Sequence, residues 1–351
     1  MSLPAISPTK KFSKLASFMA TATTYNVSGV REDLTDALTT LAPDDCPKTS
    51  TFPKSPAPKS AYQEWQVDTL AAVSFSGQLE GADISSTQNK SVNRSRLGNY
   101  VQNFGSAWSV SRNLEAADVA GVSSEVAYAK SKTLLELKRS IEAMIGSDND
   151  RQADNGTVPG KSRALGLWIS VTPGSDVPAA FRTPTASIDT TATASLAESN
   201  FNDVFQSTFQ KVGGRRDYTL YAGPSLKRAI SNFQRVTGAT GTTKTYQVTQ
   251  AAKEHRVDLS VSIYEGDFHV VSVVPDLFNG ILDGADPGAA TDQQKARGYV
   301  INPELVGIGY QFGFESQELP DFGGGRNGWI RSCVTLMVKN PLGLGKFAAT
   351  S

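Results

Sequence analysis

Histidine and cysteine, the residues that most often hold metals or act in nucleophilic chemistry, are scarce in this chain and lie far apart. Its 351 residues include two histidines, His255 and His269, and two cysteines, Cys46 and Cys333. A structural zinc site needs a cluster of such ligands at short spacings. The sequence therefore predicts neither a metal centre nor a disulfide framework.

Two glycine-rich segments could be compared with phosphate-binding loops, but neither has the required pattern. A P-loop has a glycine, four further residues and then Gly-Lys-Ser/Thr. Here Gly345-Lys346 is followed by Phe347, and Asn340 occupies the position of the first glycine. The other segment, "GGGRNG" at 323–328, precedes a strand pattern, so no helix N-terminus is available to hold an anion. We expect a tight turn at 323–328.

A serine-based catalytic triad is not predicted either. The chain contains no Gly-x-Ser-x-Gly segment, the sharp turn that exposes a nucleophilic serine. His269 lies in the strand pattern "DFHVVSVV" and His255 just before another strand pattern that starts at Arg256, with no nucleophile motif beside them. We predict that the protein is not an enzyme and binds no cofactor.

The charge balance excludes two further classes of protein. Lys and Arg number 34 and Asp and Glu also number 34, so there is no basic excess of the kind that marks dedicated nucleic-acid binders or polybasic membrane proteins. The apolar run at 15–20 is too short for a signal peptide, and no segment approaches the roughly 18 apolar residues of a membrane span. We expect a soluble protein without a membrane partner.

Two strand patterns are separated by an unusually long polar segment. In residues 64–77 the side chains of Trp65, Val67 and every second residue up to Phe75 follow the period of a half-buried strand. A second strand pattern covers 96–110. The segment between them is far longer than the two to five residues that usually close a hairpin. Because an isolated hairpin is marginal in water and its edges invite pairing, we expect its partner to be another copy of the chain.

The remaining patterns predict a mixed α+β fold with antiparallel pairing. Residues 1–60, rich in Ser, Thr, Pro and Lys, predict an extended arm with one short helix at 31–41, although their composition equally permits a disordered tail. Apolar residues at helical spacing predict one long helix over 118–146, about 40 Å in length. The other expected elements are a buried strand at 164–171, a helix at 196–214, a strand and a helix within 217–235, a hairpin at 256–276 and a strand at 330–338.

The order of these elements resembles that of the major capsid proteins of tailed bacteriophages, which have the Hong Kong 97-type fold. The chain is most similar to the phage SU-ten-like branch of these proteins. The segments that carry this similarity are "EWQVDTL", "EGAD", "NYVQNF", "SRALGLWI", "YEGDFHVV" and "ELPDFGGGRNGWIRSCVTLMVKNPLGLGKF". Each is short, but their order and spacing extend over nearly the whole chain.

The resemblance implies a division of the chain into the parts of that fold. These are an N-terminal arm (1–60), the long loop called the E-loop (61–110), a peripheral domain with a spine helix (111–160), an axial domain (161–255), a hairpin of the peripheral domain (256–280) and a return to the axial domain with a C-terminal strand (281–351). The E-loop would reach across a neighbouring subunit and complete its sheet. We expect the contacts between subunits at Trp65, Lys90, Arg94, Arg96, Tyr100 and Phe104.

The function that the resemblance implies is that of a structural protein. The chain would assemble with itself into pentamers and hexamers, and these into an icosahedral shell that encloses the double-stranded DNA genome. We expect non-specific contact with that DNA, a separate scaffolding protein, a portal protein and possible binding of a decoration protein. The protein would be found in the virion, after assembly in the host cytoplasm. The sequence leaves two alternatives open, namely an encapsulin-like compartment shell and a secreted β-rich surface adhesin.

Overall fold

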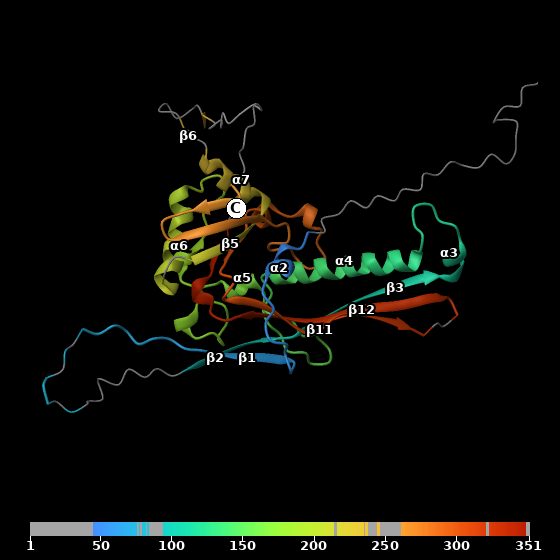
Figure 1. Ribbon diagram of the computed structural model, residues 1–351, viewed down its shortest axis with the longest axis horizontal. Coiled ribbons are helices and arrows are strands. Elements are labelled where there is room, and N and C mark those ends of the chain that lie inside the picture. The colour runs from blue at the N-terminus through green and yellow to red at the C-terminus, as the bar shows by residue number, and fades with distance from the viewer. Residues whose placement is uncertain are drawn as a thin grey trace, which may run out of the picture. The chain divides into compact units, whose positions relative to one another are not determined.

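The computed structural model describes residues 45–75, 77, 79–81, 83, 94–213, 216–234, 236–237, 244–245, 261–320 and 323–348 (Figure 1). The chain divides into two units, one of residues 1–40 and 117–123 and the other of residues 41–116 and 124–351. All helices and strands below belong to the second unit. The helix predicted at 31–41 lies outside the described residues. Among the helices that are described, none is long and apolar enough to cross a membrane.

One part of the second unit is a three-stranded antiparallel sheet covered by a long helix (Figure 1). β12 (Gly325–Val338) lies between β11 (Val306–Leu319) and β3 (Gln102–Ser111). α4 (Glu125–Gly146) buries its apolar face against this sheet, and α3 (Arg112–Ala116) follows β3. The residues of this small core are Trp108, Val110, Val126, Leu137 and Ile330. The strand predicted at 330–338 is the second part of β12, which begins earlier, at Gly325.

α4 is the predicted long helix, but it starts later than the sequence pattern suggested. Ser124 is extended, and its side chain accepts a hydrogen bond from the backbone N–H of Ala127, which caps the helix. Gly121 has φ of 79°, a conformation outside the right-handed helix. The helix thus has 22 residues and a length of about 33 Å. The prediction of a start at 118 was wrong because apolar residues continue the helical spacing beyond the cap.

The other part is a six-stranded sheet with the order β4, β13, β10, β5, β9, β8. Helices α6 (Glu198–Val212) and α7 (Pro224–Ser231) bury their apolar faces against it. The predicted helix at 196–214 is confirmed, and it ends at Gly213, whose φ is 69°. The strands are β4 (Ile188–Asp189), β5 (Arg216–Ala222), β8 (Ile263–Glu265), β9 (His269–Pro275), β10 (Gly298–Ile301) and β13 (Gly345–Phe347).

Short elements complete the unit. They are α2 (Pro47–Thr51), α5 (Leu165–Trp168), η2 (Ala179–Phe181), η3 (Thr185–Ser187), η4 (Asn232–Gln234), β6 (Val236–Thr237), β7 (Lys244–Thr245), η5 (Pro287–Ala289), α8 (Asp292–Lys295) and η6 (Pro341–Gly343). The buried strand predicted at 164–171 is instead the single helical turn α5. Most of its residues are buried as expected, with Leu165 and Trp168 fully inaccessible. A short apolar run alone cannot distinguish the two structures.

The strand pairing crosses three of the domain boundaries that the resemblance implies. The hairpin at 256–276 is present as β8 and β9, but β9 forms a parallel ladder with β5, so it belongs to the six-stranded sheet and not with the spine helix. β11 and β12 lie in the sheet that α4 covers, although 281–351 was assigned to the axial domain. β3, expected in the E-loop, pairs along its length with β12. The parallel pairs β5–β9 and β4–β13 also depart from purely antiparallel pairing.

Candidate assembly arm and its anchors

A two-stranded ladder leads from the body to a long excursion of the chain. β1 (Tyr62–Val67) and β2 (Ser95–Tyr100) pair antiparallel, with Tyr62 opposite Tyr100 and Val67 opposite Ser95. We call this ladder the root and residues 68–94 the arm. The strand predicted at 64–77 thus ends at Val67, and the described residues beyond it form no strand.

The root is built into the core of the subunit. Trp65 and Leu97 face each other across the ladder, are 9% and 2% exposed, and pack in the main core, where the ring of Trp65 lies 5.8 Å from that of Trp168. Asn99 is fully buried. Its Nδ2 lies 2.8 Å from the carbonyl oxygen of Leu336 and 2.9 Å from Oγ of Ser162. Both kinds of contact fix the root to the body.

A buried arginine of the body, Arg163, lies next to the root and helps to fix it. The side chain of Arg163 is 1% exposed and donates to both carboxylate oxygens of Asp176, at 2.9 and 2.7 Å, and to Asp150 at 2.8 Å. Its guanidinium lies 4.9 Å from the ring of Trp168. Burial alone would raise the pKa of Asp176, but the hydrogen bonds and charge of Arg163 outweigh it and hold that pKa below its ordinary value. The backbone N–H of Arg163 also donates to Asn99, at 2.7 Å.

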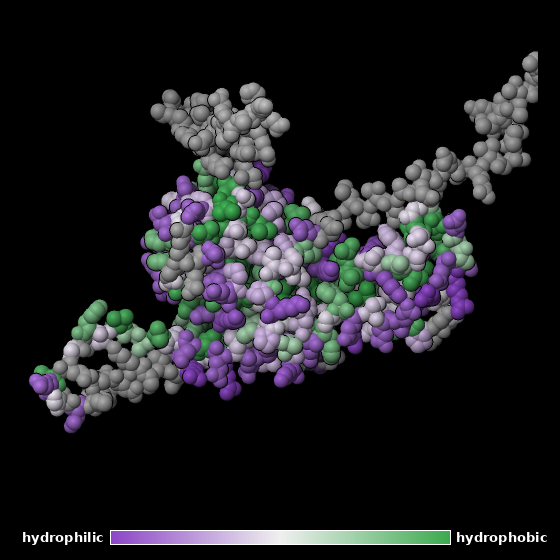
Figure 2. Space-filling view, viewed as in Figure 1, coloured by the Kyte–Doolittle hydropathy of each residue, from purple (hydrophilic) through white to green (hydrophobic). Residues whose placement is uncertain are grey.

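The arm has the opposite character. Leu70, Val73, Phe75 and Leu79 are 98%, 82%, 97% and 84% exposed, and Figure 2 shows apolar surface along the arm that is open to solvent. Large apolar side chains grouped in this way on a surface usually mark an interaction site. Near them, Glu80 has no ion-pair partner among the residues that the structure describes. The sequence pattern had pointed to Val73 and Phe75, whereas Leu70 is out of phase with its period of two and Leu79 lies beyond the predicted strand.

The aromatic residues predicted to contact a neighbour lie mainly within their own subunit. Trp65 is part of the main core. Tyr100 is half-buried, with its ring 4.6 Å from that of Tyr62. Phe104 is half-buried under α4.

The cationic residues of that prediction are at the surface. Arg94 and Arg96 have side chains that are 71% and 72% exposed, with nitrogens 3.5 Å from Asp68 and 4.0 Å from Glu64. Both remain available to a neighbouring molecule. Lys90 lies outside the described residues. Asn99, which fixes the root, was not predicted, because nothing in the sequence separates it from an ordinary polar strand residue.

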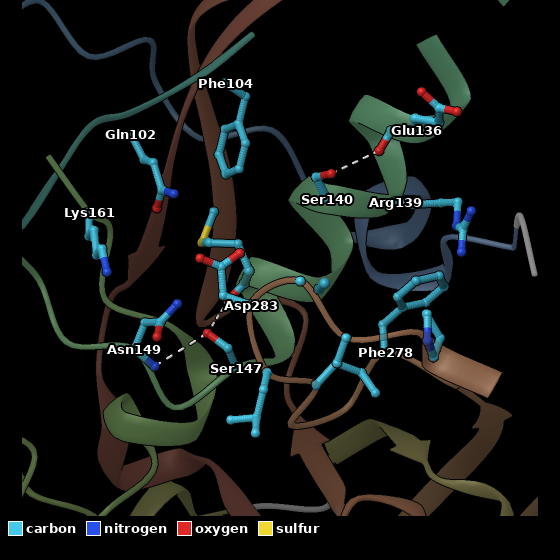
Figure 3. Close-up of a pocket in the computed structure, with 17 residues that line it drawn as sticks. Gln102, Phe104, Glu136, Arg139, Ser140, Ser147, Asn149, Lys161, Phe278 and Asp283 are labelled. Carbon is cyan, nitrogen blue, oxygen red and sulfur yellow. Dashed lines mark hydrogen bonds between the residues drawn. The ribbon is translucent and has the colours of Figure 1, made fainter. Parts of the chain in front are cut away.

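A cavity of about 370 Å³ lies between α4, the start of β3 and the loop at 281–287 (Figure 3). Its apolar lining includes Phe104, Phe278 and Leu282, and Leu282 is 71% exposed. Arg139 of α4 and Lys161 lie on opposite sides of it (Figure 3). Nε of Arg139 is buried without a hydrogen-bond partner among the described residues. The cavity therefore combines an apolar lining with two basic side chains, Arg139 and Lys161, and two acidic ones, Glu136 and Asp283.

The chain segment before the root is fastened to the body by a second polar cluster. Residues 47–55, which we call the strap, begin with α2, where proline at the first helical position is tolerated because it needs no hydrogen-bond donor. The carboxylate of Glu142 accepts the backbone N–H groups of Lys48 and Thr49, both at 2.8 Å, and so caps α2. Farther along, Ser55 N–H donates to the carbonyl oxygen of Ile308, at 2.8 Å, on the edge of β11.

Lys48 is the centre of this cluster. Its side chain and those of Glu142 and Asp276 are fully buried, with Nζ 3.3 Å from Oε1 of Glu142 and in direct contact with Oδ2 of Asp276. Burial alone would lower the pKa of Lys48, but the two carboxylates outweigh it and raise that pKa above its ordinary value. The strap is therefore held by a buried ion pair as well as by backbone hydrogen bonds.

The residues considered for metal or catalytic chemistry do not form a site in the described part of the chain. No group of three or more metal-binding side chains is present there. His269 is buried in β9, with its ring stacked 3.9 Å from that of Phe205. His255 lies outside the described residues. The features that suggest a function are the arm, its root, the cavity and the strap.

Comparison with known proteins supports the resemblance seen in the sequence. A model of the family described as "SU10 major capsid protein" matches residues 18–351. The fold is similar to that of the capsid of a native GTA particle, with a TM-score of 0.62, 10% identity, and coverage of 93% of this chain and 98% of that one. No curated protein matches the chain.

Capsids of two cyanophages are similar as well. That of cyanophage P-SCSP1u gives a TM-score of 0.57 at 10% identity and covers 92% of this chain and 94% of its own. That of cyanophage Pam1 gives 0.56 at 10% identity, with coverage of 94% and 98%. Such low identities show the fold alone, and the predicted Hong Kong 97-type α+β fold is confirmed.

The family match spans nearly the whole chain and decides among the functions that the sequence left open. It favours a capsid protein over a compartment shell or an adhesin. The chain belongs to the SU10 major capsid protein family, and it is a phage major capsid protein that forms the shell of the particle.

Proposed function

We propose that subunits join by passing the arm to a neighbouring copy, and that pentamers and hexamers built in this way close an icosahedral shell around double-stranded DNA. The observation that carries this proposal is the exposure of Leu70, Val73, Phe75 and Leu79 beside a rigid root. A single subunit gains nothing from holding such side chains in water. A shell in which every arm is covered gains from each of them.

The free energy gained by burying these side chains explains why the arm can stay exposed until subunits assemble. Full burial of one large apolar side chain contributes about 1.5–3 kcal/mol. Four such side chains per subunit offset a substantial part of the entropy lost when subunits associate, and the same contact recurs in every subunit. The backbone from Asp68 to Phe75 forms no strand within the subunit, so it could add a strand to the edge of another sheet.

The receiving surface that fits the arm best is the cavity beside α4. Its apolar lining matches the exposed side chains of the arm, and Leu282 extends this apolar surface to the rim. Arg139 and Lys161 of a lining that also includes Glu136 and Asp283 can pair with the acidic residues Glu80 and Asp83 of the arm. We propose that the arm of one copy covers this cavity in the next.

The parts of the chain are then assigned as follows. The N-terminal arm (1–60) includes the strap, and the E-loop consists of the root and the arm. The peripheral domain consists of α4 with β3, β11 and β12. The axial domain is the six-stranded sheet with α6 and α7, to which the hairpin of β8 and β9 now belongs.

The further partners are those that a shell of this kind needs. We propose a separate scaffolding protein, a portal protein and non-specific contact with the packaged DNA, and a decoration protein as an optional partner. The net charge of zero agrees with a weak, local contact to DNA. The protein assembles in the host cytoplasm and remains in the virion.

Purification of the protein with its scaffold, followed by sedimentation and negative-stain microscopy, tests the proposal. The wild type should give closed shells. A variant with Leu70, Val73 and Phe75 all changed to serine should fold and remain as free subunits or small oligomers. Leu135→Ser, at a 44% exposed site on α4, is the matched control and should assemble normally. Normal shells from the triple variant would refute the proposed role of the arm, and a wild type that stays monomeric with scaffold would refute the assembly itself.

A further inference from the structure

Three ionisable side chains from distant parts of the chain meet in the buried interior of the molecule. Lys48 comes from α2, Glu142 from α4 and Asp276 from the segment after β9, and all three side chains are fully buried. Removing such charges from water is expensive, and an ion pair seldom recovers the whole cost. Covalent bonding between two of the groups would remove two of the three charges.

The contacts around Asp276 suit attack on its carboxyl carbon. Oδ2 lies in direct contact with Nζ of Lys48 and accepts no hydrogen bond of regular geometry from the described residues. Oδ1 accepts the backbone N–H of Phe278, at 2.8 Å. One oxygen is therefore held by a donor of the kind that stabilises an oxyanion, and the other is free to leave.

Space for this approach depends on a glycine at the end of α4. A Cβ atom at Gly146 would lie 3.0 Å from Nζ of Lys48 and 2.4 Å from the carbonyl oxygen of Phe278. A larger residue would push the lysine away from Asp276 or displace the loop that carries it. The packing therefore holds the amine against the carboxyl group.

We propose that Lys48 and Asp276 condense into an intramolecular isopeptide bond, with Glu142 as the proton carrier. One proton passes from the Lys48 ammonium to Oδ2 of Asp276, and the freed amine attacks the carboxyl carbon. Oδ1 carries the developing negative charge under the N–H of Phe278. Glu142, whose Oε1 lies 3.3 Å from Nζ, takes a second proton from nitrogen and returns it to the leaving oxygen.

The atoms and charges of this reaction balance without any further reagent. An ammonium and a carboxylate give an amide and one water molecule, and both protons of that water come from Lys48. The carboxylate of Glu142 is regenerated and keeps the backbone hydrogen bonds from Lys48 and Thr49. No oxidant, nucleotide or metal is required.

Amide formation between free molecules in water is unfavourable, but the orientation and burial of the groups in this site make the reaction more favourable. Well-oriented groups held in contact can react with effective molarities of about 10⁵–10⁸ M. The product also replaces a buried ion pair by a neutral amide, which lowers the cost of burial. Because the two carboxylates raise the pKa of Lys48, the neutral amine is a minor form, and the bond should form slowly after folding.

The bond would tie the strap covalently to the body. The linked residues are 276 − 48 = 228 positions apart in the chain, so the closed loop includes the root, the arm and α4. The N-terminal arm could then not be pulled from the subunit without breaking a covalent bond.

Mass spectrometry of aged, fully folded protein tests the proposal directly. The wild type should be lighter than its sequence by the mass of one water molecule. Trypsin should fail to cut after Lys48 and should release a branched peptide that joins the segments around Lys48 and Asp276. Lys346 forms a partly exposed ion pair with Asp148, with 3.3 Å between the charged atoms, and it serves as the internal control that stays unlinked.

Two variants separate the chemistry from the fold. Lys48→Arg should show no loss of water. Glu142→Gln, which keeps the size of the side chain, should slow the loss at least tenfold. Wild-type protein with the full sequence mass and ordinary cleavage after Lys48 would overturn the proposal, whatever the variants do. Complete linkage in Glu142→Gln at the wild-type rate would overturn the role given to Glu142.

Discussion

The root and the arm are consecutive parts of one β-patterned segment, yet they differ in almost every physical property. In the root, Trp65 is 9% exposed, whereas Phe75, at an equivalent position of the same alternation, is 97% exposed in the arm. The ladder ends at the pair Val67–Ser95. The difference lies in the contacts that the body provides, since Trp168 and Arg163 pack against the root, and Leu336 and Ser162 accept hydrogen bonds from its Asn99. A strand pattern thus predicts which side chains must be buried, and the surrounding structure determines whether the subunit itself buries them.

Loss of a root aromatic should have the largest effect on the free subunit. Trp65→Ala leaves a cavity beside Trp168 and should lower the free energy of unfolding by about 3–5 kcal/mol. Phe75→Ala in the arm should change it by less than about 0.5 kcal/mol, since it removes no contact within the subunit. Urea denaturation followed by tryptophan fluorescence or circular dichroism measures both. Equal losses in the two variants would remove the distinction between root and arm.

Removal of the buried amide of the root should come next. Asn99→Ala leaves the carbonyl oxygen of Leu336 and the N–H of Arg163 without their side-chain partner and should cost about 1–3 kcal/mol of unfolding free energy. Asn103→Ala, at an exposed position of β3, is the control and should cost little. A neutral result for Asn99→Ala would mean that the root is held by its apolar side chains alone.

The ion pair beneath the root should make subunit stability depend on acid. The pKa of Asp176 is lowered in the folded state, so its contribution is fully present above the ordinary value of 3.8 and is lost as the pH falls from there through the folded value. Unfolding free energies measured from pH 6 to pH 3 should therefore fall more steeply in the wild type than in Asp176→Asn. Parallel curves would show that the pair with Arg163 contributes no pH dependence.

Charge reversal at the base of the arm should have the smallest effect. Arg94→Glu and Arg96→Glu break exposed ion pairs, which are typically worth about 0.2–1 kcal/mol each. The subunit should remain as stable as the wild type, while shells should dissociate at slightly lower temperature because the change recurs in every copy. Calorimetry of subunits and of shells measures the two effects separately, and a large loss in free subunits would contradict the assignment of both residues to the surface.

The sequence was most informative where a pattern depends on local chemistry. The apolar faces and C-terminal ends of α4 and α6 follow from helical spacing and glycine, and the antiparallel pairing of β1 with β2 follows from alternation. The partners of β9 and β12 could not be predicted, because many strands can satisfy the same alternation and only tertiary packing chooses among them. The cluster of Lys48, Glu142 and Asp276 was missed for the same reason, since its members are far apart in sequence and each looks like a surface charge.

Hydrogen–deuterium exchange, compared between free subunits and assembled shells, tests most directly whether the arm is completed by a neighbour. Amides of β1 and β2 should exchange slowly in both states, because the root is already paired and buried. Amides from Asp68 to Phe75 should exchange rapidly in the free subunit and become protected in the shell. Equally rapid exchange of that segment in closed shells would show that no neighbour covers the arm and would contradict the proposed mode of assembly.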